Sequence, residues 1–400
     1  MKELMSKAFQ GFEGGLFSSV EKADVGDSYQ KLAQQGVDLM GWADPFMPDD
    51  CLPEPVMKAA IQAIQQPSFA HYTAPVGNME LKQEIAKKLK AKNQLIVDPQ
   101  RHILITPGSD SGLYFAMLSC LDPGDEVLLP CPCYPNNFQN CTLLGAKAVP
   151  VLLTKENGYQ LQVNALKQAI TTKTKMIVLT HPNNPTTTVY TKESLNALCQ
   201  VVIEYNLILV VDQAFEDFTF ENKMITPAAL PGMWERTITV FSVSKGMGLS
   251  GLRVGYLVCQ DAFMDSMYAS AVSVLGAINT SAQQAVIAAF QHQDYMKDFE
   301  SAYAYRRKKA VELLSDIEGV SIQLPESGFL CWVDVSELGN SGDIASYLLK
   351  EARVSVNDGA NYGLGGNGHL RIVLGVYRDN QKIVDALMRI RAALLAYPKE

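Results

Sequence analysis

The chain has 400 residues, 48% of them hydrophobic, which is enough for a large buried core divided between two domains. Its net charge of −8 argues against nucleic acid as a main partner, because phosphate backbones attract clustered lysine and arginine. The one basic cluster, residues 87–92, follows apolar residues that share one helical face, so a solvated helix face is favoured over a binding patch.

The first 15 residues lack the apolar region of a secretory signal, and no apolar run is long enough to cross a membrane. Eight scattered cysteines agree with a reducing compartment, so we expect a cytoplasmic protein without a membrane partner. The histidines are isolated from one another, and Cys131 and Cys133 form the one close cysteine pair, so no metal site is expected.

From about residue 48 to 285, short β-rich apolar runs alternate with amphipathic helical stretches such as 191–206, for which Thr191 is a suitable N-cap. The predicted strands cover 102–108, 126–130, 148–153, 175–181, 207–213, 237–244 and 253–259. Buried strands that alternate with helices predict an α/β domain, built on a mostly parallel seven-stranded sheet with helices on both faces.

After about residue 290 the pattern changes to a long helix over 294–317 and an antiparallel pair of strands over 321–335. A helix over 341–352 and a strand over 369–376 follow, which together predict a smaller α+β domain. The first residues have no βα rhythm and are expected to pack on it. The predicted division is a large domain of residues 48–285 and a small domain of residues 1–47 and 286–400.

Polar or small residues follow several predicted strands at the end where open α/β sheets bind ligands. They are Gly108, Ser109, Asp110, Asn183, Asn184, Asp212, Ser242, Ser244 and Lys245. If the sheet is parallel, these groups converge on one site.

Each member of this group has an ordinary interpretation when it is taken alone. Lys245 would be a surface lysine, and Asp212 would be a helix cap or part of a structural salt bridge. A lysine in a dry site, however, forms a Schiff base with a carbonyl, and a buried carboxylate requires a partner. Arg253 would hold a phosphate together with the hydroxyl groups of Ser242 and Ser244. The bend and helix start at 107–110 would also bind a phosphate, through backbone N–H groups. Pyridoxal 5′-phosphate has the matching phosphate, aldehyde and basic ring nitrogen.

The sequence at 242–256, "SVSKGMGLSGLRVGY", closely resembles the SxSKxxGxxGxRxGY signature of the class I/II aminotransferases, which have the aspartate-aminotransferase fold. "HPNNPT" (181–186) is similar to the NPxNPTG turn of that family, and "VVDQAFEDF" (210–218) to its DEAY segment. "PGDEVLLPCPCYP" (123–135) and "HYTAPVGNMELKQEIA" (71–86) resemble two further motifs, in the order of the family and over nearly the whole chain. The resemblance implies a PLP-dependent transferase fold.

The resemblance also implies roles for the residues of the site. Lys245 would form the Schiff base and move a proton on the substrate, while Asp212 would pair with the ring nitrogen. The other implied cofactor contacts are Asn184 on the ring oxygen, Tyr134 and Phe215 beside the ring, and Gly108, Ser109, Asp110, Ser242, Ser244 and Arg253 around the phosphate.

Arg371 corresponds to the family's arginine for the substrate α-carboxylate, and Gly41 and Trp42 lie on the segment that closes over the substrate. Tyr72 would reach the cofactor of a second subunit, which implies a homodimer.

One segment and two single residues depart from the family's pattern. The segment is "GWADPF" (41–46), which keeps little of the usual G-x-P-D-F. Phe215 replaces a tyrosine whose phenol shares the ring oxygen with Asn184, so we predict a mainly protonated Schiff base at neutral pH. Thr187 stands where glycine ends the NPxNPTG motif, which leaves the geometry of that turn open. No second arginine is identified for a side-chain carboxylate, so dicarboxylic substrates are not established, and Trp42 favours an apolar or aromatic side chain.

The predicted function is transfer of the amino group of an L-α-amino acid to a 2-oxo acid. The same site would also suit a C–S β-lyase or an enzyme similar to aminocyclopropane-carboxylate synthase, because surrounding residues decide which bond breaks. A non-catalytic regulator is disfavoured, since the resemblance begins within the first 50 residues and the chain is acidic.

Overall fold

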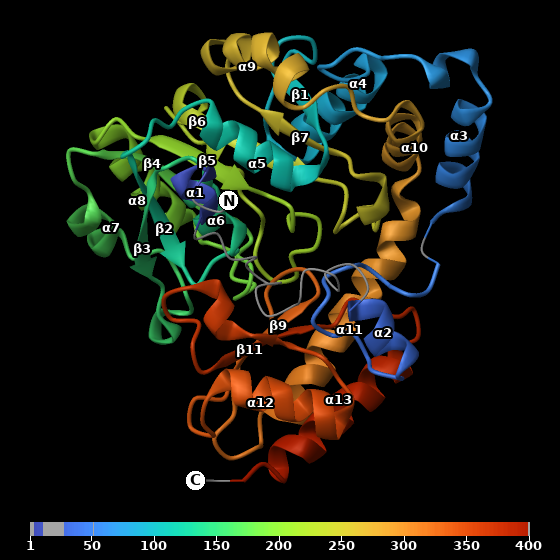
Figure 1. Cartoon of the computed structure of the whole chain (residues 1–400), viewed down its shortest axis with the longest axis vertical. Coiled ribbons are helices and arrows are strands. Elements are labelled where there is room, and N and C mark those ends of the chain that lie inside the picture. Colours follow the sequence, from blue (N-terminus) through green and yellow to red (C-terminus); the bar gives the residue numbers. More distant parts are fainter. Residues whose placement is uncertain (1–3, 11–27, 51, 399–400) are drawn as a thin grey trace.

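The computed structural model describes residues 4–10, 28–50 and 52–398. Figure 1 shows an upper body built on a seven-stranded sheet and a lower body that contains β9, β11 and the helices α11 to α13. The strands of the larger sheet are β1 Ile103–Thr106, β2 Glu126–Cys131, β3 Lys147–Leu152, β4 Thr174–Thr180, β5 Ile208–Asp212, β6 Thr237–Ser242 and β7 Gly255–Val258. Each lies within or next to a strand predicted from the sequence.

The order of the larger sheet is β1-β7-β6-β5-β4-β2-β3, and its pairs are parallel except where β7 joins β1 and β6. Residues 243–254, which contain the short 3₁₀ turn Ser250–Leu252 but no crossover helix, connect β6 to β7. Parallel neighbours require a crossover, so this connection reverses the chain and makes β7 antiparallel. The predicted mostly parallel sheet is therefore confirmed, and the bend that carries Lys245 lies where the chain reverses.

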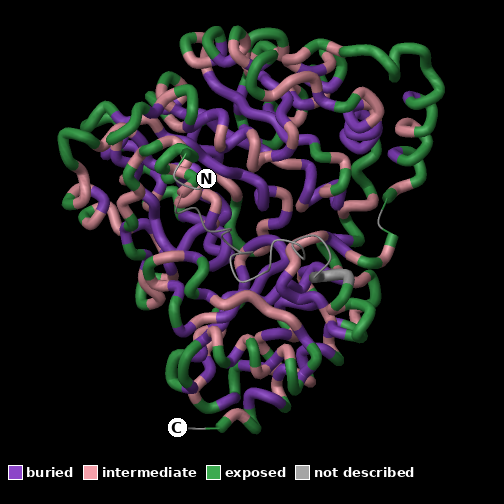
Figure 2. Tube along the Cα trace, in the orientation of Figure 1, coloured by how far each residue is buried: buried purple, intermediate pink, exposed green. Residues whose placement is uncertain are grey.

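Alternation along each strand distributes apolar side chains to both faces of the sheet. Leu104 and Val127 pack with α5, α6 and α9 on one face, whereas Ile103 and Leu128 pack on the other face, which α4, α8 and α10 cover. Figure 2 shows most of the larger sheet as buried segments inside a more exposed shell, whereas the edge strand β3 is largely not buried. The helices of this body are α3 Glu54–Ile64, α4 Met79–Lys88, α5 Gly108–Leu118, α6 Asn136–Leu143, α7 Val163–Ala169, α8 Lys192–Glu204, α9 Asp261–Val274 and α10 Thr280–Gln291.

Two local predictions about helices can be compared with the structure. The Thr191 side chain caps α8 by accepting a hydrogen bond from the Ser194 N–H at 3.1 Å, as predicted. The apolar face of α4 is buried, but the expectation of a solvated basic face is wrong for Lys88. Its ammonium pairs with the buried Glu216 carboxylate, because α4 packs against the segment that follows β5.

The second sheet is antiparallel, in the order β10-β11-β9-β8. Its strands are β8 Ser321–Ile322, β9 Leu330–Asp334, β10 Asn357–Asp358 and β11 His369–Val373, and the helices with it are α11 Met296–Leu314, α12 Ser341–Tyr347 and α13 Asn380–Leu395. The predicted helix over 341–352 continues past α12 as a π-helical turn, Leu348–Ala352. Two short helices near the start are α1 Lys7–Gln10 and α2 Ser28–Gln34.

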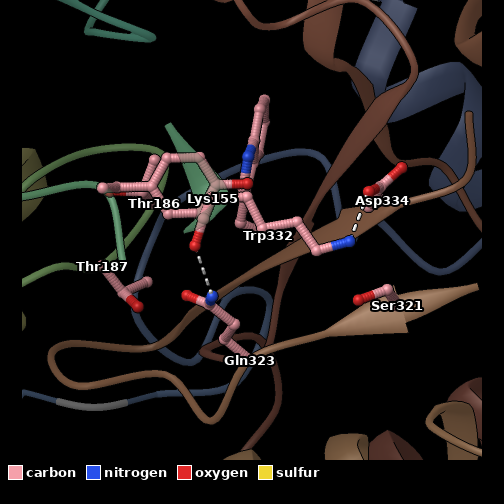
Figure 3. Close-up of a pocket in the computed structure, with 8 residues that line it drawn as sticks. Lys155, Thr186, Thr187, Ser321, Gln323, Trp332 and Asp334 are labelled. Atoms are coloured by element: carbon pink, nitrogen blue, oxygen red, sulfur yellow. Dashed lines mark hydrogen bonds and ion pairs between the residues drawn. The ribbon is translucent and has the colours of Figure 1, made fainter. Parts of the chain in front are cut away.

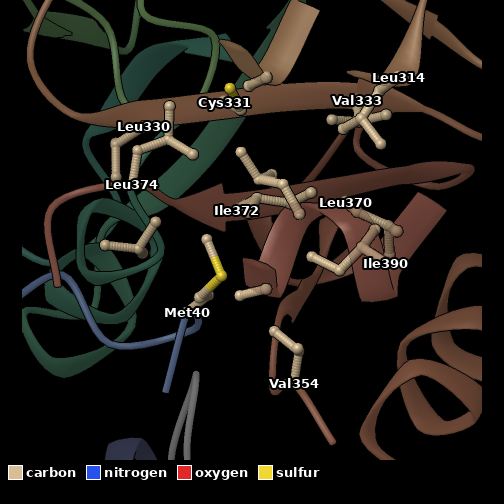
Figure 4. Packing of buried hydrophobic residues seen from close by; sticks show 14 of the residues in the cluster. Met40, Leu314, Leu330, Cys331, Val333, Val354, Leu370, Ile372, Leu374 and Ile390 are labelled. Carbon is tan, nitrogen blue, oxygen red and sulfur yellow. The ribbon is translucent and has the colours of Figure 1, made fainter. Parts of the chain in front are cut away.

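Part of the N-terminal segment packs on this second core. Met40 lies among Leu370, Ile372 and Val354 (Figure 4), and its carbonyl accepts a hydrogen bond from the Val373 N–H at 2.7 Å. Segments at the two ends of the described chain therefore share one core. We propose that the two domains predicted above correspond to these two bodies, because each sheet has its own buried core. The predicted small domain differs at its start, since α1 lies against α6 of the larger body (Figure 1).

Candidate active site

A cavity of about 670 Å³ lies where β5 and β6 end, at Asp212 and Ser242. Open α/β sheets bind ligands at this edge. The other predicted residues that line it are Gly41, Trp42, Ser109, Asp110, Tyr134, Asn184, Phe215, Ser244, Lys245, Arg253 and Arg371. The structure thus brings together most of the predicted site, from segments that are far apart in the sequence.

Lys245 lies on the bend between β6 and β7, and its Nζ donates a hydrogen bond to the Ala43 carbonyl at 2.6 Å. Burial lowers the pKa of Lys245 from 10.5 to about 8, although the carboxylates of Asp110 and Asp44 oppose this change. A neutral amine therefore forms within about one pH unit of neutrality. Only the neutral amine attacks a carbonyl, so this environment activates the lysine.

Asp212 ends β5 and is buried, and its Oδ1 accepts a hydrogen bond from the Ala214 N–H at 3.0 Å. Burial raises the pKa of Asp212 from 3.8 to about 7; the hydrogen bond and Lys245 lower it, and Asp110 adds to the increase. A carboxylate in such a place gains most from a cationic partner. Asp212 is therefore suited to hold a protonated ring nitrogen.

One end of the cavity is suited to an anion. Helix α5 begins at Gly108, whose φ of 81° requires glycine, and a Cβ there would lie 2.5 Å from Arg253 Nη2. A Cβ on Gly255 would lie 2.8 Å from the Ser109 N, so the helix start and β7 are in close contact. The N–H groups of a helix start and an adjacent guanidinium together bind phosphate.

Arg371, which also lines the cavity, is buried on β11 of the second sheet. Its Nη2 donates to Asn357 Oδ1 at 2.7 Å and to the Gly41 carbonyl at 3.2 Å, and its Nη1 donates to Asn184 Oδ1 at 3.2 Å. These acceptors are all neutral, so they orient the guanidinium without neutralising it. The guanidinium of Arg371 is therefore available to bind a carboxylate.

Tyr134 lies beside two carboxylates of the cavity. Burial, with the nearby charges of Asp110 and Asp212, holds the pKa of Tyr134 well above its ordinary value of 10. Asn136 Nδ2 donates to the Tyr134 hydroxyl at 3.2 Å and to Asp110 Oδ1 at 3.0 Å. Tyr134 is thus a neutral aromatic side chain in a fixed position.

Both residues that depart from the family's pattern contact the turn between β8 and β9. The Phe215 ring lies 5.5 Å from that of Phe329 and fills the space where Gly328 has no side chain. Thr187 has a φ of 65°, the left-handed conformation that glycine adopts most easily, and its Oγ1 accepts a hydrogen bond from the Glu326 N–H at 3.2 Å. The threonine therefore forms the turn at a conformational cost that this hydrogen bond partly offsets.

A second hollow, shown in Figure 3, lies behind the turn that carries Thr186 and Thr187. Its volume is about 10 Å³, and an ion pair of 2.7 Å between Lys155 and Asp334 borders it. This volume accommodates no more than about one water molecule, so the hollow is not a substrate site.

Among residues 4–10, 28–50 and 52–398, no group of three or more histidine, cysteine or acidic residues is arranged to hold a metal ion. No helix in that part of the chain is both long and apolar enough to cross a membrane. The Sγ atoms of Cys131 and Cys133 are 3.6 Å apart, and neither belongs to a disulfide.

The family model for aminotransferase class I and II matches residues 37–387. The chain belongs to that family. It is 34% identical to the aspartate aminotransferase of Musicola paradisiaca over 88% of each chain, and 30% identical to a probable aspartate/prephenate aminotransferase of Aquifex aeolicus over 91% of this chain and 93% of that protein.

Solved structures of the family agree with the fold. Aspartate aminotransferase from Thermus thermophilus with maleate has a TM-score of 0.86 at 28% identity, covering 96% of this chain and 99% of that one. Alanine aminotransferase from Pyrococcus furiosus has a TM-score of 0.87 at 26% identity, covering 98% and 99%. The predicted PLP-dependent transferase fold is confirmed.

This aminotransferase therefore uses pyridoxal phosphate, an amino acid and a 2-oxo acid, as predicted. The residues present fit that cofactor, since the cavity combines an activated lysine, a buried carboxylate and an anion-binding helix start. The names of the relatives do not favour the lyase and cyclase alternatives.

Several lining residues of the aminotransferase were not predicted: Ala43, Asp44, Asn136, Gln139, Ala214, Ser250 and Gly251. Asp44 accepts a hydrogen bond from Ser250 Oγ and lies three residues after Gly41, so the sequence around Gly41 was the available signal. Of the predicted residues, Gly108 lies behind Arg253 and does not line the cavity. Tyr72 is fully exposed and also lies outside it.

Proposed function

We propose that Lys245 and Asp212 are the catalytic pair of this aminotransferase. The single observation that supports the assignment most strongly is that both line one cavity, with pKa values shifted toward neutrality, to about 8 and about 7. Structural ion pairs usually move the two values apart, because each partner favours the charged form of the other. Groups with pKa values near the working pH are those that transfer protons efficiently.

When bound, pyridoxal phosphate supplies the electron-withdrawing ring that weakens the bonds at the substrate Cα. Lys245 would hold the cofactor through its Nζ, release it to the incoming amino group, and then carry a proton on the freed amine. Asp212 would keep the ring nitrogen protonated. The phosphate would lie at Ser109 and the start of α5, with Arg253 beside it.

The remaining contacts would orient the cofactor and the amino acid. Tyr134 would cover one ring face, Asn184 would donate to the ring oxygen, and Arg371 would bind the α-carboxylate. In the structure, Asn184 Oδ1 accepts from Arg371, so its amide group links the two binding positions. An amino acid held in this way has its Cα near Lys245, as proton transfer requires.

We also propose a homodimer, supported by exposed apolar side chains on and after α3. They are Met57, Ile61, Ile64, Phe69 and Tyr72. Met57, Ile61 and Ile64 are spaced four and three residues apart, so they share one face of α3, and an exposed apolar helix face is typical of a protein interface. The cysteines that the structure describes are all free, which supports a reducing, cytoplasmic location.

The test combines labelling and turnover. Borohydride reduction of the enzyme with bound cofactor, followed by peptide mapping, should place the label on Lys245. The variant Lys245→Ala should carry no reducible label and should transfer no amino group. A label on any other lysine would refute the assignment.

A further inference from the structure

The basic stretch at residues 87–92 contributes one member of a buried ion pair. The Lys88 ammonium pairs with the Glu216 carboxylate, and their side chains are only 10% and 4% exposed. Lys88 Nζ also lies 4.2 Å from the centre of the Phe241 ring on β6. Apolar residues of the same volume often stabilise a fold as well as a buried ion pair does, whereas a buried pair specifies which segments meet. This pair specifies the contact between α4 and the segment that follows β5.

The Glu216 carboxylate has further hydrogen-bond donors. Its Oε2 accepts from Asn93 Nδ2 at 2.6 Å and from Gln213 Nε2 at 3.2 Å. Both amides also donate to Thr226 Oγ1, at 2.8 Å and 3.2 Å. Asn93 belongs to the π-helical turn that continues α4, Leu89–Asn93. Donors from α4, from this turn and from residue 213 therefore fix the position of the carboxylate as well as satisfy its charge.

The turn formed by residues 213–217 connects this network to Asp212. The Glu216 N–H donates to the Gln213 carbonyl at 3.2 Å, which closes the turn. Within it, the Ala214 N–H donates to Asp212 Oδ1 at 3.0 Å. The donor that orients the Asp212 carboxylate therefore lies between Asp212 and the anchored Glu216, so a displacement of Glu216 moves that donor.

The same turn contacts the bend that carries Lys245. A Cβ on Gly246 would overlap the Asp217 carboxylate, so these two residues are in direct contact. Asp217 also pairs with Lys92 of the π-helical turn, at 2.5 Å between Oδ1 and Nζ. Both members of the proposed catalytic pair are therefore adjacent to residues that α4 and its π-helical extension hold.

We propose that Lys88 and Glu216 are positioning residues of this aminotransferase, and that their buried pair fixes the turn 213–217 so that Asp212 meets the ring nitrogen of the cofactor. This inference rests on the proposed role of Asp212. A carboxylate stabilises a protonated nitrogen through a directional, charge-assisted hydrogen bond, so its effect depends on its position. A misplacement of about 1 Å lowers the rate of a reaction by up to about a hundredfold. Neither Lys88 nor Glu216 lines the cavity, so both act through the turn and not by contact with the cofactor.

Kinetics of the variant Lys88→Met test the inference. Methionine removes the ammonium, keeps a long side chain and leaves the buried Glu216 without its cationic partner. We expect kcat to fall at least about tenfold while KM changes less than about threefold, because Asp212 acts on the ring, whereas Arg371 on the second sheet would bind the substrate. Lys87→Met removes the exposed neighbouring lysine and is the matched control, with wild-type kinetics expected. A wild-type kcat in Lys88→Met, or a change in KM alone, would overturn the inference.

A binding measurement does not depend on turnover. Cofactor-free protein is titrated with pyridoxal phosphate and with the analogue in which CH replaces the ring nitrogen, and the ratio of the two dissociation constants is compared between variants. The two compounds share the aldehyde and the phosphate, so a general loss of structure weakens both equally and leaves the ratio unchanged. We expect the wild type and Lys87→Met to prefer pyridoxal phosphate, and Lys88→Met to lose at least about fivefold of that preference. A wild-type ratio in Lys88→Met would overturn the inference.

The variant Asp212→Asn distinguishes failure of the inference from failure of the proposed function. It should lose the preference for the ring nitrogen. If it keeps the wild-type ratio, the proposed role of Asp212 is wrong, and the inference is refuted with it. If Asp212→Asn loses the preference while Lys88→Met keeps it, only the inference is wrong. Should Lys88→Met fail to fold, Glu216→Gln, which keeps the shape of the side chain, decides by the same ratio: a reduced preference supports the inference, and the wild-type ratio overturns it.

Discussion

Replacing Asp212 with asparagine should stabilise the cofactor-free protein while it abolishes amino-group transfer. Burial raises the pKa of this carboxyl from 3.8 to about 7. Each pH unit corresponds to about 1.4 kcal/mol, so ionising Asp212 in the folded protein costs about 4 kcal/mol relative to the unfolded chain. Asparagine has nearly the same shape, keeps an oxygen to accept the Ala214 N–H, and has no charge to bury.

The pH dependence has a definite sign. A carboxyl whose folded-state pKa is raised contributes stability that is fully present below its unfolded pKa, near 3.8. That stability is lost as the pH rises to about 7. The stability advantage of Asp212→Asn over wild type should therefore grow by roughly 3 kcal/mol between pH 5 and pH 8.

Urea unfolding of both cofactor-free proteins at several pH values measures this advantage. The matched control is Asp265→Asn, which removes an exposed carboxylate from α9 and should give no comparable gain. If the advantage did not increase with pH, or if Asp212→Asn were less stable than wild type at pH 8, the account of Asp212 would be refuted.

Three further changes test other parts of the site. Phe215→Tyr adds a phenol that favours the deprotonated form of the Schiff base between Lys245 and the cofactor. A titration of cofactor absorbance should therefore give a lower pKa for this Schiff base in the variant than in the wild type. A wild-type Schiff base that is already deprotonated at pH 7 would contradict the prediction. Gly255→Ala places a Cβ 2.8 Å from Ser109 N, so the dissociation constant of the cofactor should rise at least about tenfold. A dissociation constant equal to that of the wild type would count against the crowded helix start. Arg371→Ala removes the carboxylate partner and should raise KM for the amino acid by about two orders of magnitude, whereas a change in kcat alone would exclude that role.

Local regularities were accessible from the sequence. The apolar runs that alternate with amphipathic helical stretches predicted the seven strands of the larger sheet to within a few residues. This was possible because the spacing of apolar residues that marks a strand or a helix is a property of a short segment. Asp212, at the end of β5, and Lys245, shortly after β6, were identified from the sequence because a parallel sheet places the residues at its strand ends along one edge. The antiparallel direction of β7 required knowledge of the strand order, which sequence periodicity does not contain.

The sequence by itself determined the chemical groups at the strand ends, and with them the cofactor. Only the tertiary structure decided how those groups are charged and which other groups face them. Burial between two bodies moves the pKa values of Lys245 and Asp212, and chain folding brings the 41–44 segment beside them, with Asp44 facing the same cavity. Burial and electrostatic interactions depend on distances between residues remote in sequence, which only the folded chain fixes.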